Sequence, residues 1–190
     1  GIDTAPEAIE HGKAQGLSVA VSDLVDINPF NKCFDVVLMQ NVLEHLASPT
    51  ETIKKIYDDV LNDGGLLIID VPNEFNVFQE AGREVHSLSQ WWVAPPAHLN
   101  YFTPKTLRNL LEGEGFVVVD ELASFPLEMF LLMGENYVEN SELGRACHEK
   151  RMSFEENLRK TGNIATLHDF YRGLAKQNLG RQILMIAKKG

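Results

Sequence analysis

The feature that most constrains the fold is a short apolar segment followed at once by polar residues, within residues 34–46. Residues 35–39 are mostly apolar and contain a β-branched pair, which predicts a strand buried on both faces. Residues 42–46 then read as a helical turn. In an open parallel α/β sheet, groups just past the carboxyl end of a strand line the ligand crevice. We therefore expect a functional edge formed by Gln40, Asn41, Glu44 and His45.

Strands and helices alternate along the rest of the chain, which predicts an α/β fold with a Rossmann-like, doubly wound, mostly parallel sheet. Apart from 35–39, the expected strands are 1–3, 17–21, 66–71, 116–120 and 180–188. The last two are separated only by a helical insertion over 127–179, so they are expected to pair antiparallel at one edge. We expect residues 1–190 to form one domain, with this insertion as a cap or lid within it.

Helix starts and one long irregular segment can also be read from the sequence. Thr4 and Thr50 are expected to cap the helices that follow them, and Thr103-Pro104 starts an amphipathic helix. Residues 74–102 show no periodicity and gather aromatic side chains, which is typical of a functional loop. Stacking on a planar or sugar ligand and packing in the core are both open roles for Trp91 and Trp92.

Composition limits the class of protein and its partners. The chain has 190 residues and a net charge of −10, which argues against nucleic acid as a partner because phosphate binding rests on Lys and Arg. Its two cysteines, Cys33 and Cys147, are too few for a disulfide framework, so a reducing, cytoplasmic location is the default. We expect no membrane segment.

The order of the motifs resembles the class I S-adenosylmethionine-dependent methyltransferases, and among them the ubiquinone-pathway O-methyltransferases, over nearly the whole chain. The motifs that carry the resemblance are Gly1-Ile2-Asp3, Ser22-Asp23, Phe34-Asp35-Val36-Val37, Leu43-Glu44-His45-Leu46, Asp63-Gly64-Gly65, His98-Leu99-Asn100-Tyr101-Phe102-Thr103-Pro104 and Gly115-Phe116. The resemblance also implies a Gly-rich turn after a preceding strand. The sequence opens at Gly1 without it, so we expect further residues upstream in the natural protein.

The resemblance implies S-adenosylmethionine as cofactor and S-adenosylhomocysteine as product. It assigns Asp3, with Thr4 beside it, to the ribose hydroxyls, although a helix cap is an alternative role for Asp3. It assigns Asp23 to the adenine amino group with Leu24 packing on the ring, although a plain turn residue is an alternative for Asp23. Beneath the methionine part and the methyl group it places Gln40 and Asn41.

Methyl transfer to oxygen requires a base, and His45 and His98 are the best-placed candidates because histidine titrates near neutral pH. The set Glu44, His45 and His98 also resembles the metal-binding Glu-x-x-Glu-His…His pattern of small-RNA terminal 2′-O-methyltransferases. One carboxylate and two imidazoles suit a divalent metal. Asn41 stands where that pattern has its first Glu, which removes a charge. The alternative is that Glu44 and His45 only orient the loop through hydrogen bonds.

We predict a methyltransferase that acts on a small-molecule acceptor. The resemblance favours O-methylation of a sugar or glycan precursor, with a quinone or phenolic metabolite as the second choice. A catalytically silent, methyltransferase-like binding or assembly module is the alternative from another class. A nicotinamide-dependent oxidoreductase explains neither the Leu43-Glu44-His45 motif nor the His98 to Pro104 segment. The insertion 127–179 is open between a substrate lid and a homodimer surface.

Overall fold

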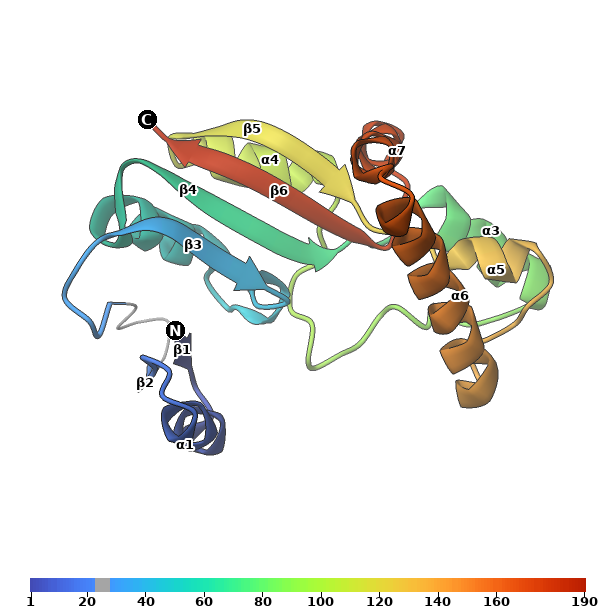
Figure 1. Ribbon diagram of the computed structural model, residues 1–190, viewed down its shortest axis with the longest axis horizontal. Coiled ribbons are helices and arrows are strands. Elements are labelled where there is room, and N and C mark those ends of the chain that lie inside the picture. The colour runs from blue at the N-terminus through green and yellow to red at the C-terminus, as the bar shows by residue number, and fades with distance from the viewer. Residues whose placement is uncertain (23–27) are drawn as a thin grey trace.

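The computed structural model describes residues 1–22 and 28–190, and its strands form two sheets (Figure 1). The smaller sheet pairs β1 (Ile2–Asp3) with β2 (Ala20–Val21) in parallel, and α1 (Pro6–Ala14) connects them. In Figure 1 this unit lies apart from the larger sheet, below the edge strand of that sheet.

The larger sheet has the strand order β3-β4-β6-β5. Strands β3 (Phe34–Gln40) and β4 (Leu61–Pro72) are parallel. Strand β6 (Gln182–Lys189) lies between β4 and β5 (Phe116–Ala123) and runs antiparallel to both. The predicted antiparallel pairing of the last two strands is therefore confirmed. In addition, β6 pairs with β4, so β3 and β5 are the two edge strands of this sheet.

Helices cover the larger sheet and extend beyond one end of it. They are α2 (Pro49–Lys55), which continues as a π-helical turn (Ile56–Val60), α3 (Val77–His86), α4 (Pro104–Gly113), α5 (Glu128–Leu132), α6 (Ser141–Lys160) and α7 (Ile164–Lys176), with a 3₁₀ turn at Leu43–His45. The segment 127–179 thus contains α5, α6 and α7. Among the described residues, no helix is both long and apolar enough to cross a membrane.

Helix starts follow local chemistry, and two of the three predicted caps are wrong. Thr103 caps α4 as expected, because its hydroxyl accepts from the Thr106 N–H at 3.2 Å. Neither α1 nor α2 has a side-chain cap; their N-cap residues are Ala5 and Ser48 rather than the predicted threonines. Both helices have proline in the first turn, where one of the unsatisfied N–H groups is already absent.

The core fills one face of the larger sheet, where α2 and α4 pack. Its fully buried side chains include Ile53, Leu67, Ile69, Leu107, Leu111 and Met185. The opposite face of β3 is exposed, with Val36 at 51% and Leu38 at 60%. The prediction that this strand is buried on both faces is therefore wrong, because that face of β3 borders an open cavity instead of a helix.

Helix α3 lies inside the segment that was predicted to be irregular, and this is a second correction. Its buried positions are Gln79 and Gly82, one turn apart, so the buried face carries no apolar periodicity. Its start is nevertheless well defined. The Asn76 side chain accepts from the Gln79 N–H, and the Gln79 side chain accepts from the Asn76 N–H, which forms a capping box.

Candidate functional site

Two amide side chains follow β3, and they point in different directions. Gln40 donates from Nε2 to Asp70 Oδ2 on β4 at 3.4 Å. Asn41 has a left-handed backbone with φ 50°, a conformation that asparagine tolerates better than most residues. Its N–H donates to the Asp70 carbonyl oxygen at 2.8 Å, and its Oδ1 accepts from Gln182 on β6 at 3.2 Å. Asn41 lines the cavity described below, whereas Gln40 does not.

The loop before α4 is fixed against the turn that follows β3. The backbone N–H groups of Asn100 and of the residue before it both donate to the Glu44 carbonyl oxygen, at 3.0 and 2.9 Å. The Asn100 side chain donates to the Leu46 carbonyl oxygen at 2.6 Å. These hydrogen bonds hold His98 beside His45, although the two residues are distant in sequence.

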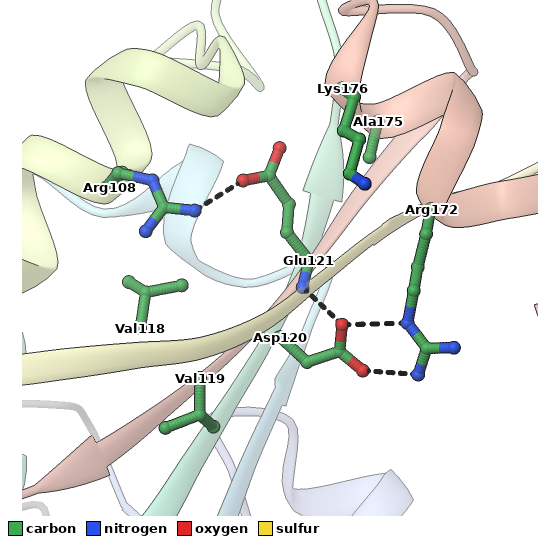
Figure 2. A pocket seen from close by; sticks show the side chains of 8 residues that line it. All are labelled: Arg108, Val118, Val119, Asp120, Glu121, Arg172, Ala175 and Lys176. Carbon is green, nitrogen blue, oxygen red and sulfur yellow. Dashed lines mark hydrogen bonds and ion pairs between the residues drawn. The ribbon is translucent and has the colours of Figure 1, made fainter. Parts of the chain in front are cut away.

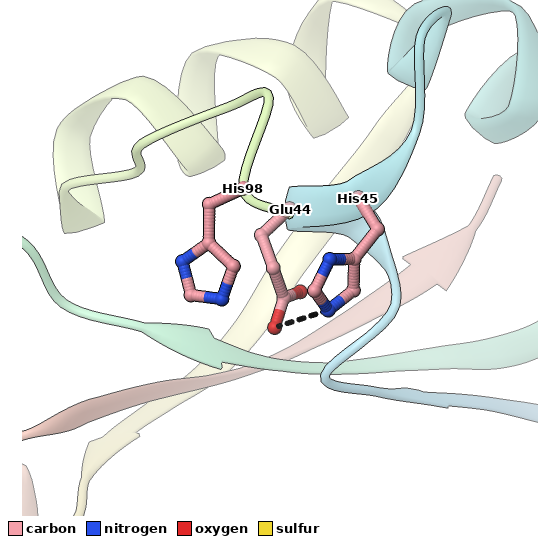
Figure 3. Close-up of side chains that lie close together, drawn as sticks. All are labelled: Glu44, His45 and His98. Carbon is pink, nitrogen blue, oxygen red and sulfur yellow. Dashed lines mark ion pairs between the residues drawn. The ribbon is translucent and has the colours of Figure 1, made fainter. Parts of the chain in front are cut away.

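Glu44, His45 and His98 converge at this point (Figure 3). One nitrogen or oxygen atom from each side chain lies within 4.8 Å of those of the other two. The centroids of the two imidazole rings are 5.0 Å apart. Nε2 of His45 lies 3.8 Å from Oε1 of Glu44. The structure therefore brings together the residues that the sequence predicts for the acceptor side or for a metal.

Hydrogen bonding determines which nitrogen of His45 can accept a proton. Its Nδ1 lies 2.7 Å from the carbonyl oxygen of Ala97. A carbonyl oxygen can only accept, so Nδ1 carries the hydrogen and the neutral ring keeps its lone pair on Nε2, facing Glu44. Glu44 is only 2% exposed. Its Oε2 and the Nδ1 of His98 are buried without a hydrogen-bond partner among the described groups, which is uncommon in proteins.

A cavity of about 830 Å³ opens between the smaller sheet and β3. Its polar lining includes Asp3, Thr4, Asn41 and His45, and the exposed face of β3 forms an apolar wall. This volume lies within the range of sites that bind small molecules, about 300–1,000 Å³. An acidic group at one end and amide and imidazole groups at the other fit a long ligand that has a polar group at each end.

Asp3 forms one local hydrogen bond, since its Oδ1 accepts from the Ala5 N–H at 2.8 Å. This bond supports the start of α1. It is consistent with a structural role at the helix start, which the sequence analysis leaves open as the alternative to ribose binding by Asp3. The residue is exposed, and within residues 1–22 and 28–190 its second carboxylate oxygen accepts no hydrogen bond. Asp23 and Leu24, expected at the adenine, lie outside the described residues.

Sequence reasoning missed one buried carboxylate at this edge, Glu74. It is 4% exposed, and its Oε2 accepts from Gln79 Nε2 at 3.2 Å. Burial raises the pKa of Glu74 to about 6, although the Gln79 hydrogen bond and the charge of Arg181 both act to lower it. Perturbed pKa values of this kind cluster at functional sites. The one sequence feature that could have identified Glu74 is its position directly after a buried strand and the pair Pro72-Asn73.

A second cavity, of about 260 Å³, lies where α4, β5 and α7 meet (Figure 2). Its two arginines pair with its two carboxylates. Arg172 forms two hydrogen bonds with Asp120, at 2.7 and 3.0 Å, and Arg108 donates to Glu121 at 2.7 Å. These charges neutralise each other, and Lys176 lines the cavity as a further cation. The ion pairs join α4 and α7 to β5.

The model of the methyltransferase domain family matches residues 1–121, which include β1 to β4 and the Glu44, His45 and His98 cluster. The chain belongs to the methyltransferase domain family. It is an S-adenosylmethionine-dependent methyltransferase, with S-adenosylmethionine as cofactor and S-adenosylhomocysteine as product. The class I resemblance is thereby confirmed, and the oxidoreductase alternative loses its support. No curated protein matches the chain.

Solved structures share the fold at low sequence identity. A SAM-dependent methyltransferase from Archaeoglobus fulgidus has a TM-score of 0.60 and 18% identity, with 100% of this chain and 75% of that chain covered. An S-adenosylmethionine-dependent methyltransferase from Mesorhizobium loti has a TM-score of 0.53 and 13% identity, with 99% of this chain and 78% of that chain covered. The [4+2]-cyclase SpnF has a TM-score of 0.55 and 20% identity, with 100% of this chain and 65% of that chain covered. These similarities confirm the Rossmann-like fold and leave the acceptor open.

Proposed function

We propose that this methyltransferase methylates a small-molecule acceptor that binds beside His45 and His98. The observation that carries the proposal is the geometry of one sheet edge. The cavity with Asp3 at its far end reaches Asn41 and His45, and His98 lies against His45 on the other side. A cofactor and an acceptor must meet in line for methyl transfer, so adjoining sites are required.

In this proposal Asp3 accepts hydrogen bonds from the ribose hydroxyls, with Thr4 next to it. Asn41 forms the floor beneath the methionine part, and Gln40, which does not line the cavity, acts only through its hydrogen bond to Asp70. Asp23 and Leu24 keep the adenine roles that the resemblance implies. When bound, the cofactor supplies an electrophilic methyl group on a sulfonium. The residues of the chain align the acceptor and exclude water.

A hydroxyl acceptor must lose its proton as its oxygen attacks. His45 is suited to take that proton, because the Ala97 carbonyl leaves the lone pair on Nε2 and Glu44 stabilises the charged ring. His98 then orients the acceptor from the opposite side. The expected hydroxyl belongs to a sugar or glycan precursor or to a quinone or phenolic metabolite, as the family resemblance implies.

Calorimetric titration of S-adenosylhomocysteine into the full-length protein tests the cofactor assignment. Asp3→Asn should weaken binding about 10- to 100-fold, because hydrogen bonds to a charged group contribute about 1.5–3 kcal/mol. Glu7→Gln is the matched control, since Glu7 is an exposed acid in the first turn of α1 outside the cavity. Equal affinities of the Asp3 variant and the control would contradict the role of Asp3. No binding by the folded protein would favour the silent-module alternative.

Methyl transfer from labelled cofactor to panels of sugars and phenols tests the acceptor side. His45→Gln should lower kcat about 10²- to 10⁴-fold while the affinity for S-adenosylhomocysteine changes little. His148→Gln on α6 is the control, because this histidine is exposed and outside the site. An unchanged kcat in the His45 variant would remove the proposed base.

A divalent cation at Glu44, His45 and His98 is a second candidate, favoured by the unpartnered buried atoms. The Ala97 carbonyl orients His45 as the carbonyls behind metal-bound histidines do, and Glu44 supplies a buried carboxylate. One carboxylate and two imidazoles leave coordination positions open for an acceptor hydroxyl. A bound cation would lower the pKa of that hydroxyl directly.

Metal analysis of the purified full-length protein distinguishes a metal-ligand role from a general-base role for His45. We expect one divalent ion per chain in the wild type and loss of that ion in Glu44→Gln. His148→Ala should keep it. Absence of metal from the wild type after dialysis against Mn²⁺, Co²⁺ or Zn²⁺ would exclude the metal role and leave the base role intact.

A further inference from the structure

A continuous row of aromatic rings extends from the candidate site into the segment between β4 and α4. Ring centroids are separated by 6.2 Å from His98 to Tyr101, 5.8 Å from Tyr101 to Phe75, 5.9 Å from Phe75 to Trp92 and 4.7 Å from Trp92 to Trp91. Adjacent rings are inclined by 56° to 88°. Successive rings therefore pack at steep angles to one another, with Phe75 exposed and Trp92 buried, and we call this set of residues the aromatic row.

Phe75 is the most unusual member of the aromatic row. Its side chain is 46% exposed, and its backbone has φ 61°, a left-handed conformation that bulky residues rarely adopt. Hydrogen bonds on either side hold it there. The Glu74 N–H donates to the Phe102 carbonyl oxygen, and the capping box of α3 begins at Asn76. Backbone strain that is held from both sides is typical of ligand-binding segments.

The chain segment that carries Phe75 also carries an acidic residue. Glu74 directly precedes Phe75 and is buried, with Gln79 of α3 as its only recorded side-chain partner among the described residues. Arg181, just before β6, pairs with the fully buried Glu128 of α5 at 2.6 Å. With Arg181 paired in this way, an ionised Glu74 leaves the group of three side chains negative.

We propose that the aromatic row binds an alkylammonium group carried by the methyl acceptor. The inference rests on the proposed function and narrows its acceptor class to hydroxyl compounds that also carry an alkylammonium group, which the aromatic row holds while the hydroxyl is methylated. A cation is attracted to the faces of Phe, Tyr and Trp rings, and the negative charge of Glu74 adds to that attraction. An anionic acceptor would be repelled, and a neutral ring would gain nothing from the carboxylate. Of the two roles that the sequence left open for Trp91 and Trp92, burial to 4% exposure favours packing for Trp92, which lies behind the exposed ring of Phe75.

The chain contains its own reporter for this test, since both of its tryptophans, Trp91 and Trp92, lie in the aromatic row. The probe is choline, and its neutral isostere 3,3-dimethylbutan-1-ol is the control ligand. Both are titrated into the full-length protein while tryptophan fluorescence is recorded. We expect choline to give a saturable change in the millimolar range and the isostere to bind about 2- to 30-fold more weakly, the range expected for a cation–π contact.

Two variants test the assignment by separate means. Phe75→Leu keeps an apolar side chain but removes the ring, and Glu74→Gln keeps a hydrogen-bond acceptor for Gln79 but removes the charge. Each should weaken choline binding several-fold without affecting the isostere. Phe154→Leu on α6 is the matched control, because this phenylalanine is also partly exposed but lies outside the aromatic row.

Equal affinities for choline and its isostere, or unchanged choline binding in both Phe75→Leu and Glu74→Gln, would overturn the proposal. Neither outcome depends on the cofactor. If S-adenosylhomocysteine still binds while choline does not, the alkylammonium proposal fails and the proposed methyl transfer stands. If choline binds and S-adenosylhomocysteine does not, the proposed function fails and the aromatic row is a cation site of another kind.

Discussion

Asn100 determines the position of His98 through contacts that involve no charge and no metal. Its side chain donates to the carbonyl oxygens of Leu46 and, at 3.4 Å, Leu43, while its backbone N–H reaches Glu44. Asn100→Ala removes the side-chain donor to the Leu46 carbonyl oxygen, whereas the Leu43 carbonyl oxygen still accepts from the Leu46 N–H. We expect the free energy of unfolding, measured with urea, to fall by about 1–3 kcal/mol. Asn163→Ala is the control, because Asn163 is exposed and its side chain bonds only to the adjacent Thr161. Equal losses in the two variants would mean that Asn100 has no special role.

Glu74 should make stability depend on pH. Its folded pKa, about 6, exceeds the ordinary value of 4.5, so the native state binds more protons than the unfolded state between these pH values. Stability is therefore highest when Glu74 is protonated and falls as pH rises from about 4.5 through 6. At pH 7.5, Glu74→Gln should be more stable than the wild type by up to about 2 kcal/mol. At pH 4.5 the two should unfold alike, and a pH-independent difference would contradict the assignment.

Some residues of the candidate site can be predicted from the sequence, and others cannot. His45 and Asn41 are predictable because they follow an apolar strand at a fixed distance, and His98 because it begins a motif that precedes a capped helix. Glu74 is not, because an acid after a strand is usually a solvated turn residue. Its burial arises in three dimensions, where Gln79 of α3 donates a hydrogen bond to it.

At the level of elements, α3 shows why periodicity alone fails. The helix buries Gln79 and Gly82, and a β-carbon on Gly82 would lie 3.0 Å from Leu131 Cδ1 and 3.3 Å from Leu131 Cβ on α5. The glycine therefore permits two helices to pack closely, although it weakens the apparent helical signal. Helix α4 was predictable because its buried positions, Leu107 and Leu111, are apolar and its cap is a threonine.

Gly82→Ala should separate α3 from α5. Alanine gains about 1 kcal/mol of helix propensity, but the added methyl group must displace Leu131, at a cost of about 1–3 kcal/mol. We expect the melting temperature to fall. Gly173→Ala on α7 is a sharp control, because no atom lies within 4 Å of the β-carbon it adds, so this variant should become more stable. A rise in both variants would show that the contact between α3 and α5 can relax.

For the whole molecule, the central fact is that the smaller sheet and β3 are not joined by a strand ladder among the described residues. The cavity between them is bordered by Asp3 on one side and by Asn41 and His45 on the other. Periodicity indicates the order of elements but not which strand edges pair. The family resemblance does imply this division, because it places the absent upstream strand between residues 1–3 and 35–39. The upstream strand that the resemblance implies stays a prediction.

A ligand that bridges the two sides of this cavity must link the stabilities of the two sheets. Without ligand, the amides of α1 should exchange with solvent faster than those of β4 and β6, because the smaller sheet pairs only Ile2 with Ala20 and Asp3 with Val21. S-adenosylhomocysteine at 100 times its Kd should slow exchange in α1 by up to about 100-fold if release requires this unit to open. Strand β5, far from the cavity, is the internal control. Uniform slowing across both sheets would mean that the ligand stabilises the fold as one unit, and no change in α1 would place the cofactor away from Asp3.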